Sequence, residues 1–371
     1  MSTYCRVCTL NDDIPGIILD NTGLCNVCNK DNPAINYKGI KEALKNNKEF
    51  EAFTESDERS GGYNCMLLYS GGMDGAYALC DLVYKRKMKP LIFTLNHPFK
   101  NKESIANIQN ISKIVGVDHV VLSFDHKPYK DLMRFILTHN KGNKDIWKAE
   151  SNKDPCIGCA GYLQIKAFLF AYEMNIPYII CVDPEQTNIL PVNIFAVVKL
   201  LDMIYGEKFL VNLFDQNTAE VFSNPEKLAN VPKIVYPFIS GKPPQEEMER
   251  ELESHGLYEL SSLAMECRLH SLLDYYSLKQ YKTVYYAKEI AGRVKNGTCI
   301  REDEIQFIED YKRIILDRGA KDTLSTDEIA YITDILDSHR KNSSYKYESS
   351  MENVCDLWNI AEELDIALDK I

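Results

Sequence analysis

Short apolar runs alternate with longer stretches of helical periodicity between about residues 61 and 238. The runs are CMLLYS, PLIFTL, HVVLSF, YIICVD and KIVYPF. Because they are apolar throughout, they are typical of parallel strands that are buried on both faces of a sheet. The helical stretches between them supply the crossovers. This pattern predicts an α/β fold with a doubly wound, mostly parallel sheet.

The hydrophobic pattern changes on both sides of this region. Residues 38 to 56 form one polar helical stretch, and the chain becomes helical again after about residue 243. The segment REDEIQFIEDYKRIILDRG ends at Gly319, which suits a C-terminal cap, and STDEIAYITDIL opens with a capping box. We therefore expect four parts: a knuckle over 1–32, a helical connector over 33–60, the α/β domain over 61–245, and a helical region over 246–371.

Composition narrows the functional classes. The chain has 371 residues, a formal net charge of −11 and 45% hydrophobic residues, which is ordinary for a globular protein. The negative charge argues against a broad surface for nucleic-acid phosphates, so a small-molecule substrate is favoured and a tRNA substrate stays open. No run approaches the roughly 20 apolar residues that span a bilayer. Since MSTYCRVCTL also lacks a signal pattern, we expect a cytoplasmic protein without a membrane partner.

Twelve cysteines in a chain without an export signal favour metal-binding or catalytic thiols over disulfides. Four of them form the pattern C-x2-C-x16-C-x2-C, namely Cys5, Cys8, Cys25 and Cys28. Tetrahedral Zn²⁺ takes four such ligands, and each C-x2-C pair supplies two from one tight turn. A redox dithiol would not require two pairs. We therefore predict a closed, structural zinc site without a catalytic role.

A glycine turn, LLYSGGMDG, follows the first apolar run. In an open parallel sheet, ligands lie at the carboxyl ends of strands, where the next helices present free N–H groups. Ser70, Gly71 and Gly72 lie at this point, and the glycines let exposed amides form an anion nest. Asp74 is better suited to a magnesium ion on the anion than to the anion itself. The alternative is an ordinary strand-to-helix turn.

The residues SGGMDG resemble the SGGxDS loop of the PP-loop, or N-type ATP pyrophosphatase, superfamily. The resemblance extends through TLNHPF, YIICVDPEQTN and YPFISGKPPQEEMEREL, and it covers about residues 61–270. It implies cleavage of ATP to AMP and pyrophosphate, with adenylylation of an oxygen of the second substrate. The pattern departs at Gly75, where the superfamily has a serine whose hydroxyl assists a phosphate. The glycine removes one donor, which would weaken ATP binding or slow the chemistry.

Three further polar residues follow predicted strands. His97 comes where the superfamily's adenosine lies, so we expect a nucleotide contact; a loop hydrogen bond is the alternative. Asp183, with Glu185 beside it, comes just past a predicted strand, on the same edge as the glycine turn, where the two fit a magnesium or substrate site; a turn around Pro184 is the alternative. Lys242, in SGKPP, is expected to be a solvated lysine; a phosphate contact is the alternative.

A second cysteine set has a different character. Cys156 and Cys159 lie at the predicted start of a helix, where the dipole favours thiolate, and Cys267 follows the late YPFISGKPP segment. This order resembles the PP-loop tRNA 2-thiolation enzymes, and the resemblance implies a [4Fe-4S] cluster held by these three cysteines. The alternatives are a persulfide-forming dithiol and a second zinc half-site. Those enzymes often have arginines after the pair, where this chain has Ala160 and Gly161.

The N-terminal segment points elsewhere. CRVCTLNDDIPGIILDNTGLCNVC, followed by YNCMLLYSGGMDG, resembles the N-acetyl sugar amidotransferases of surface-glycan biosynthesis over roughly the first 80 residues. Two enzymatic hypotheses follow from this. In a sulfur transferase, Cys156, Cys159 and Cys267 deliver sulfide from a sulfur donor or carrier protein. In an amidotransferase, ammonia comes from a glutaminase subunit.

Ammonia needs no thiols, so the cysteine set favours sulfur. The third hypothesis is a non-catalytic nucleotide-binding partner, for which Gly75 is the argument. A homodimer is one of the assemblies that the sequence leaves open.

Overall fold

A computed structural model of the chain describes residues 3–29, 37–56, 62–100, 102–123, 126–138, 155–182, 193–205, 222, 228, 230–257, 267–284, 287–295, 297, 299–318 and 357–365. The chain divides into two compact units. The first comprises Met1–Ala34, Leu137–Asn152 and Leu263–Ile371, and the second comprises Ile35–Ile136 and Lys153–Ser262. The predicted boundaries follow the chain linearly, whereas the first unit groups segments from both ends of the sequence.

The second unit is built on a five-stranded sheet with the order β3-β2-β1-β4-β5, and every pair of neighbouring strands is parallel. The strands coincide with the five apolar runs: β1 (Cys65–Leu68), β2 (Pro90–Asn96), β3 (His119–Ser123), β4 (Tyr178–Ile180) and β5 (Lys233–Val235). Leu67 of the central strand lies opposite Ile92 of β2 and Ile180 of β4. The predicted fold class, including the parallel sheet expected of PP-loop proteins, is thereby confirmed.

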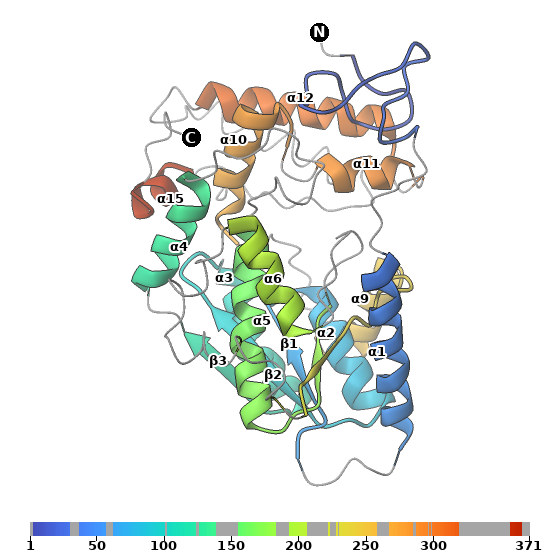
Figure 1. Cartoon of the computed structure of the whole chain (residues 1–371), viewed down its shortest axis with the longest axis vertical. Helices are drawn as coiled ribbons and strands as arrows, with labels where there is room; N and C mark the ends of the chain where they lie inside the picture. Colours follow the sequence, from blue (N-terminus) through green and yellow to red (C-terminus); the bar gives the residue numbers. More distant parts are fainter. Residues whose placement is uncertain are drawn as a thin grey trace. The chain divides into compact units, whose positions relative to one another are not determined.

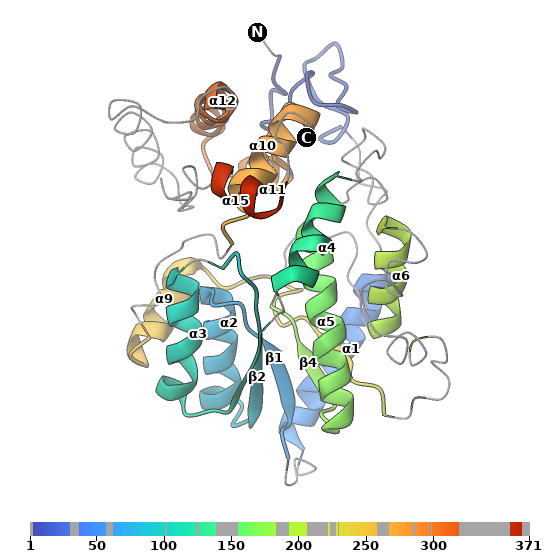
Figure 2. The ribbon, with the colours of Figure 1, turned by 90° about the vertical axis from the view of Figure 1, so that its left-hand side faces the viewer.

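Helices cover both faces of this sheet (Figures 1 and 2). One face carries α1 (Tyr37–Glu55), α2 (Met73–Cys80) with the π-helix η1 (Asp81–Lys85), α3 (Lys102–Val115) and α9 (Gln245–Ser254). Their apolar side chains form one core with the inward residues of the strands, among them Phe50, Leu67, Ile92, Ile111 and Leu252. The opposite face is covered by α5 (Pro155–Glu173), whose Phe170 ring lies 5.7 Å from that of Phe93. The sheet is therefore doubly wound.

The expectation that strands are buried on both faces fails at β3. Strands β1 and β4 are buried at every position, whereas β3 lies at the edge of the sheet and its Val121 side chain is 45% exposed. An edge strand has only one neighbour, so its apolar residues cannot all be covered. After β3 the chain continues into α4 (His126–Thr138), and α6 (Ile194–Tyr205) packs on α5.

The strand order determines where a ligand can bind. The chain proceeds from β1 through β2 to β3 on one side of the sheet, then returns to place β4 on the other side of β1. In open α/β sheets, ligands bind at the carboxyl ends of the strands where the strand order reverses, which is here between β1 and β4. The glycine turn follows β1 directly, so it lies at this topological switch point.

The first unit combines the cysteine knuckle with helices α10 (His270–Tyr281), α11 (Ala287–Lys295), α12 (Arg301–Arg318) and α15 (Leu357–Glu363). Buried Leu272, Leu278 and Ile360 belong to these helices, and α10 packs against both α12 and α15. The predicted helix REDEIQFIEDYKRIILDRG is confirmed as α12, whereas STDEIAYITDIL lies outside the described residues. Within the described ranges, no helix is long and apolar enough to cross a membrane.

Candidate functional site

The glycine turn has a backbone that requires glycine. Gly71 has a φ of +110°, which L side chains rarely adopt, and a Cβ at this position would lie 2.8 Å from the Ser104 carbonyl oxygen of α3. Gly72 is extended, with φ −87° and ψ 165°, and precedes the first residue of α2. The positive φ of Gly71 and the close approach of α3 therefore explain why this position is a glycine. The turn ends at Gly72, directly before α2 begins.

Two side chains from the β2–α3 region hold the carbonyl groups of the turn. The Lys100 ammonium donates to the Ser70 carbonyl at 2.8 Å, and the Asn107 amide donates to the Gly71 carbonyl at 2.9 Å. Within the described part of the chain, the N–H groups of Ser70, Gly71 and Gly72 have no acceptor. Carbonyls that are bound from one side leave the amides available on the other, which is the arrangement of an anion nest.

Lys100 is the most informative residue of the site. Its side chain lies in the loop after β2 and is only 6% exposed. Among the described residues, no carboxylate forms an ion pair with its ammonium group, whose single hydrogen-bond partner is the Ser70 carbonyl. A buried charge is costly unless an opposite charge accompanies it. Lys100 is not among the site residues predicted from sequence, although its place just beyond a strand end, three residues after His97, was a usable signal.

Asp74 and Lys242 form an ion pair at the mouth of the turn. Asp74 lies in the first turn of α2, and its carboxylate is 2.7 Å from the Lys242 ammonium. The prediction that Lys242 is simply solvated is therefore wrong, because its side chain is only 25% exposed. A partly exposed carboxylate is a suitable ligand for magnesium, and the ion would compete with Lys242 for Asp74. A magnesium ion on Asp74 stays a prediction.

Gly75 is explained by its neighbour Tyr69. A Cβ at Gly75 would lie 2.6 Å from Cδ2 of the Tyr69 ring, which is almost completely buried behind the turn. The missing serine is therefore coupled to an aromatic residue at the end of β1, since ring and side chain cannot occupy the same space. In this chain the Tyr69 ring packs against Gly75, in the space that a serine side chain would need. A contact between Gly75 and ATP stays a prediction.

His97 lies behind the turn rather than on the surface. Its Nδ1 accepts a hydrogen bond from the Phe99 N–H at 3.2 Å, and its ring stacks on Tyr129 with centroids 5.0 Å apart. Burial holds the pKa of His97 well below its usual value, and the charge of Lys100 lowers that pKa further. The imidazole is therefore neutral at physiological pH. The loop hydrogen bond is present, and the nucleotide contact stays a prediction.

Tyr129 connects this region to the second cysteine set. Its side chain, on α4, is 1% exposed, and its hydroxyl donates to the Cys159 Sγ at 3.2 Å. Helix α5 begins at Pro155, so the prediction that Cys156 and Cys159 lie at a helix start is confirmed. Thiolates accept such hydrogen bonds and are also the ligands of iron–sulfur clusters. Tyr129 thus contacts both the Cys159 sulfur and the His97 ring.

The remaining predicted site residues are distributed differently. The Cys156 side chain and Asp183 lie outside the described residues. Cys267 is half-buried and belongs to the first unit, so the predicted set of three cysteines stays a prediction. Three cysteines outside the two predicted sets are buried, namely Cys65, Cys80 and Cys181. Burial raises the pKa of Cys65 and of Cys80 to about 12, which keeps both as thiols.

The N-terminal cysteines form a compact cluster. The sulfur atoms of Cys5, Cys8, Cys25 and Cys28 all lie within 4.8 Å of one another, and those of Cys8 and Cys25 are 3.8 Å apart. A tetrahedral ion with bonds of about 2.3 Å to sulfur places its ligands roughly 3.8 Å apart. Ligands of an iron–sulfur cluster bind separate irons and lie further from one another. The geometry therefore fits a single tetrahedral ion.

The electrostatics of the knuckle support a cation. The pKa of Cys25 is lowered to about 5, first by its hydrogen bond with Cys8, and the pKa of Cys8 is raised by the same contact and by burial. One thiolate thus suppresses the ionisation of its neighbour, and a divalent ion would offset this repulsion. Arg301 of α12 donates to the carbonyls of Cys5 at 2.8 Å and Cys8 at 3.2 Å, which attaches the knuckle to the helical region.

No protein-family model matches the chain. The uncharacterised protein MJ1599 of Methanocaldococcus jannaschii is 27% identical over 173 residues, which are 42% of this chain and 57% of that protein. The match thus spans a little more than half of the relative's length.

Three solved structures are similar to the chain at low scores. The U34-tRNA thiolase NcsA from Methanococcus maripaludis, with its [4Fe-4S] cluster, has a TM-score of 0.32 at 16% identity, covering 83% of this chain and 90% of that chain. NMN synthetase from Francisella tularensis has a TM-score of 0.27 at 14% identity, covering 61% of this chain and 97% of that chain. The NH3-dependent NAD synthetase from Campylobacter jejuni, in complex with nitrate, has a TM-score of 0.28 at 11% identity, covering 60% of this chain and 96% of that chain. Likeness at this level carries no functional argument.

Proposed function

We propose that the chain is an ATP-dependent transferase that cleaves ATP to AMP and pyrophosphate and adenylylates a carbonyl or amide oxygen of a second substrate. The observation that carries the proposal is Lys100. Lys100 is only 6% exposed, its ammonium group donates to the Ser70 carbonyl of the glycine turn, and it has no carboxylate partner among the described residues. A phosphate completes such a site, because it accepts hydrogen bonds from the amides and compensates the buried charge.

The sum of charges favours a polyphosphate over a single carboxylate. Among the described residues, Lys100, Lys242 and the N-terminus of α2 lie at the turn, and one carboxylate, Asp74, opposes them. With a helix N-terminus counted as about half a positive charge, the net value is roughly +1.5. The multiple oxygens of a triphosphate match this charge and the several donors around the turn.

The proposal is tested by removing the buried charge. We expect Lys100→Met to weaken binding of α,β-methylene-ATP at least about tenfold, because a charge-assisted contact inside a protein is lost. Lys113→Met, which changes an exposed lysine on α3, is the matched control. Isothermal titration calorimetry measures the affinities, and thermal unfolding shows whether both variants are folded. Equal affinities of a folded Lys100→Met variant and the wild type would contradict the proposal.

For the group that replaces the activated oxygen, we propose sulfur, carried by Cys156, Cys159 and Cys267. The supporting observation is the contact from Tyr129 to Cys159 at the start of α5, because a half-buried sulfur with a hydrogen-bond donor is suited to reactive thiolate chemistry. An iron–sulfur cluster on these cysteines would hold the sulfide. An amidotransferase that uses ammonia is the second candidate, favoured by the N-terminal segment with its zinc-type knuckle.

Metal analysis separates these candidates. We expect protein purified without oxygen to contain about one zinc, together with iron and acid-labile sulfide. Alanine substitutions of Cys156, Cys159 and Cys267 should remove iron and sulfide and leave the zinc. Zinc alone, with ATP cleavage intact in the triple variant, would contradict sulfur transfer and favour ammonia.

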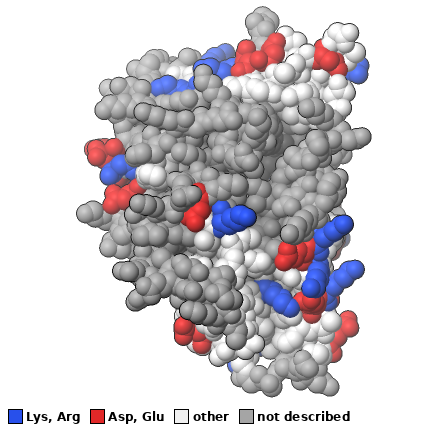
Figure 3. Space-filling view, viewed as in Figure 1, with Lys and Arg blue, Asp and Glu red and all other residues white. Residues whose placement is uncertain are grey.

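A small-molecule substrate is part of the proposal. On the face drawn in Figure 3, the described Lys and Arg side chains lie among Asp and Glu side chains rather than in one basic field. The net charge of −11 points in the same direction, since nucleic-acid backbones are bound by accumulated positive charge. A filter-binding assay with bulk tRNA tests this point, and saturable binding at physiological salt would contradict it.

A further inference from the structure

The segment between β5 and α9 is shaped to present Lys242 to the glycine turn. Gly241, directly before it, has a φ of +135°, which favours glycine, and Pro243 and Pro244 follow it. Pro244 is also the N-terminal cap of α9. A lysine between these residues has little backbone freedom, so its position at the mouth of the turn is a property of the fold.

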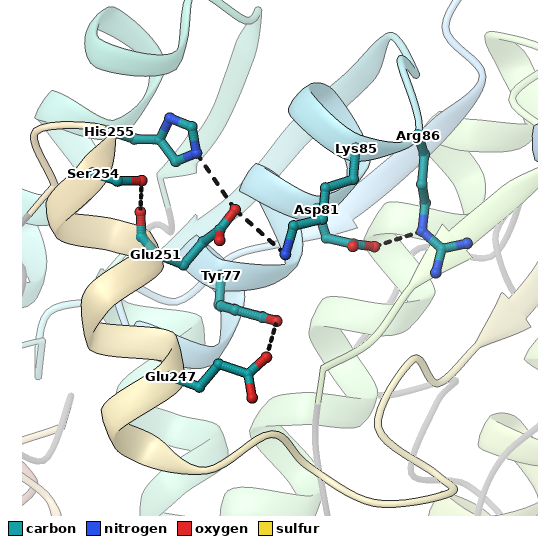
Figure 4. A network of polar contacts seen from close by, with 8 residues as sticks. All are labelled: Tyr77, Asp81, Lys85, Arg86, Glu247, Glu251, Ser254 and His255. Atoms are coloured by element: carbon teal, nitrogen blue, oxygen red, sulfur yellow. Dashed lines mark hydrogen bonds and ion pairs between the residues drawn. The ribbon is translucent and has the colours of Figure 1, made fainter.

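Helix α9 is attached to α2 and η1 along its length (Figure 4). The Tyr77 hydroxyl lies 3.4 Å from the Glu247 carboxylate, and the Lys85 ammonium lies 3.3 Å from that of Glu251. The Asp74–Lys242 pair, at 2.7 Å, is the contact closest to the turn. The first two contacts lie away from the turn, so the long side chain of Lys242 can change partner without breaking them.

Asp74 and Lys242 are also the two groups that a magnesium polyphosphate would use at this place. A carboxylate oxygen is a ligand for Mg²⁺, and an ammonium group binds phosphate oxygens. While they are paired, each blocks the other, and the charge of Asp74 repels an incoming phosphate. A lysine beside a helix N-terminus is unfavourable unless an anion accompanies it, so Lys242 needs either Asp74 or a phosphate.

We propose that the Asp74–Lys242 pair makes polyphosphate binding dependent on magnesium. A magnesium-bound nucleotide engages Asp74 through the metal and frees Lys242, which then binds a phosphate oxygen. A metal-free nucleotide has to displace Asp74 from Lys242 and meets an uncompensated carboxylate. This inference rests on the proposed function, namely that the turn binds the phosphates of ATP.

The strength of the pair is compatible with an exchange of partners. Both side chains are partly exposed, 35% for Asp74 and 25% for Lys242. Pairs of this kind contribute no more than about fivefold to an equilibrium constant, so a nucleotide with several phosphate contacts can open the pair. The exchange therefore alters affinity without requiring a rearrangement of α9.

The test compares α,β-methylene-ATP binding with Mg²⁺ and with EDTA, by calorimetry on the full chain. We expect Asp74→Asn to bind the metal-free analogue about three- to tenfold more tightly than the wild type, because Lys242 is released and one repelling charge is removed. The same variant should lose the gain in affinity that Mg²⁺ gives the wild type. Lys242→Met should bind the magnesium complex at least about tenfold more weakly.

Lys85→Met is the matched control, since it breaks the other lysine contact between α2–η1 and α9 away from the turn. It should retain the magnesium dependence of the wild type. An Asp74→Asn variant that binds the metal-free analogue no better than the wild type would overturn the inference while leaving the proposed function intact. A wild-type protein that binds neither form of the analogue would overturn both.

Discussion

The cysteine knuckle and the glycine turn both bring polar groups close together, but the two regions differ in how those groups are paired. In the knuckle, four sulfurs lie within 4.8 Å of one another and the carbonyls of Cys5 and Cys8 are bound by Arg301. At the turn, side chains bind the carbonyls of Ser70 and Gly71. Among the described residues, the amides of Ser70 to Gly72 have no acceptor, and Lys100 has no carboxylate partner.

This is the difference that we expect between a structural site and a ligand-binding one. A closed set of four thiolates uses all of its ligands on one ion and leaves no position for a substrate. An open set of donors and cations at a switch point gains its full stabilisation only when a ligand arrives. We therefore expect the knuckle to contribute to folding and the turn to contribute to binding.

The largest expected effect concerns the knuckle. Cys25→Ser should lose about one zinc and at least about 3 kcal/mol of unfolding free energy, because metal binding is folding free energy in such sites. Elemental analysis and chemical unfolding measure these changes, and Cys299→Ser is the matched control outside the cluster. Affinity for α,β-methylene-ATP should stay within about twofold, since no described contact of the turn comes from the knuckle. A parallel loss of nucleotide affinity would show that the knuckle and the turn are not independent.

The second prediction concerns the turn and reverses what the superfamily pattern implies. Gly75→Ser should lower the free energy of unfolding by about 1–3 kcal/mol, because the new Cβ meets the buried Tyr69 ring. Gly62→Ser is the control, since a Cβ there has no neighbour within 4 Å. Thermal unfolding measures both variants. If Gly75→Ser were as stable as the wild type and bound the ATP analogue more tightly, Gly75 would be a lost contact and the packing explanation would be wrong.

The smallest effect is a pH dependence. Unfolded histidine binds a proton near pH 6.5, whereas the pKa of folded His97 is well below this value because of burial. Its contribution to stability is therefore complete above pH 6.5 and is lost as the pH falls towards the folded pKa, by about 1.4 kcal/mol per pH unit. His97→Gln should reduce the slope of unfolding free energy below pH 6.5 by about this amount.

Urea unfolding at several pH values measures the slope. The knuckle also becomes less stable in acid because its thiolates are protonated, but it is the same in both proteins, so their difference reports on the region behind the turn. An unchanged slope in His97→Gln would show that His97 does not couple protonation to folding.

Much of the fold could be predicted from local patterns. The five apolar runs became the five strands, the polar stretch became α1, and REDEIQFIEDYKRIILDRG became α12. The knuckle cysteines were recognised from spacing, because two short C-x2-C turns carry most of the geometry of a tetrahedral site. These features depend on neighbours within a few residues, and periodicity or spacing records them directly.

Contacts between distant segments could not be predicted in this way. Lys100 reaches Ser70 across 30 positions, and Lys242 reaches Asp74 only because β5 and α9 return to the side of α2. The ring of Tyr69 over Gly75 depends on how the end of β1 packs, which the SGGMDG pattern does not contain.

The sequence by itself thus determined the strands, helices α1 and α12, the spacing of the knuckle cysteines and the location of the turn. Only the tertiary structure decided which charges surround that turn. The physical reason is that the parallel strand order brings the ends of separate strands to one edge of the sheet, and side-chain packing then selects which of their residues meet.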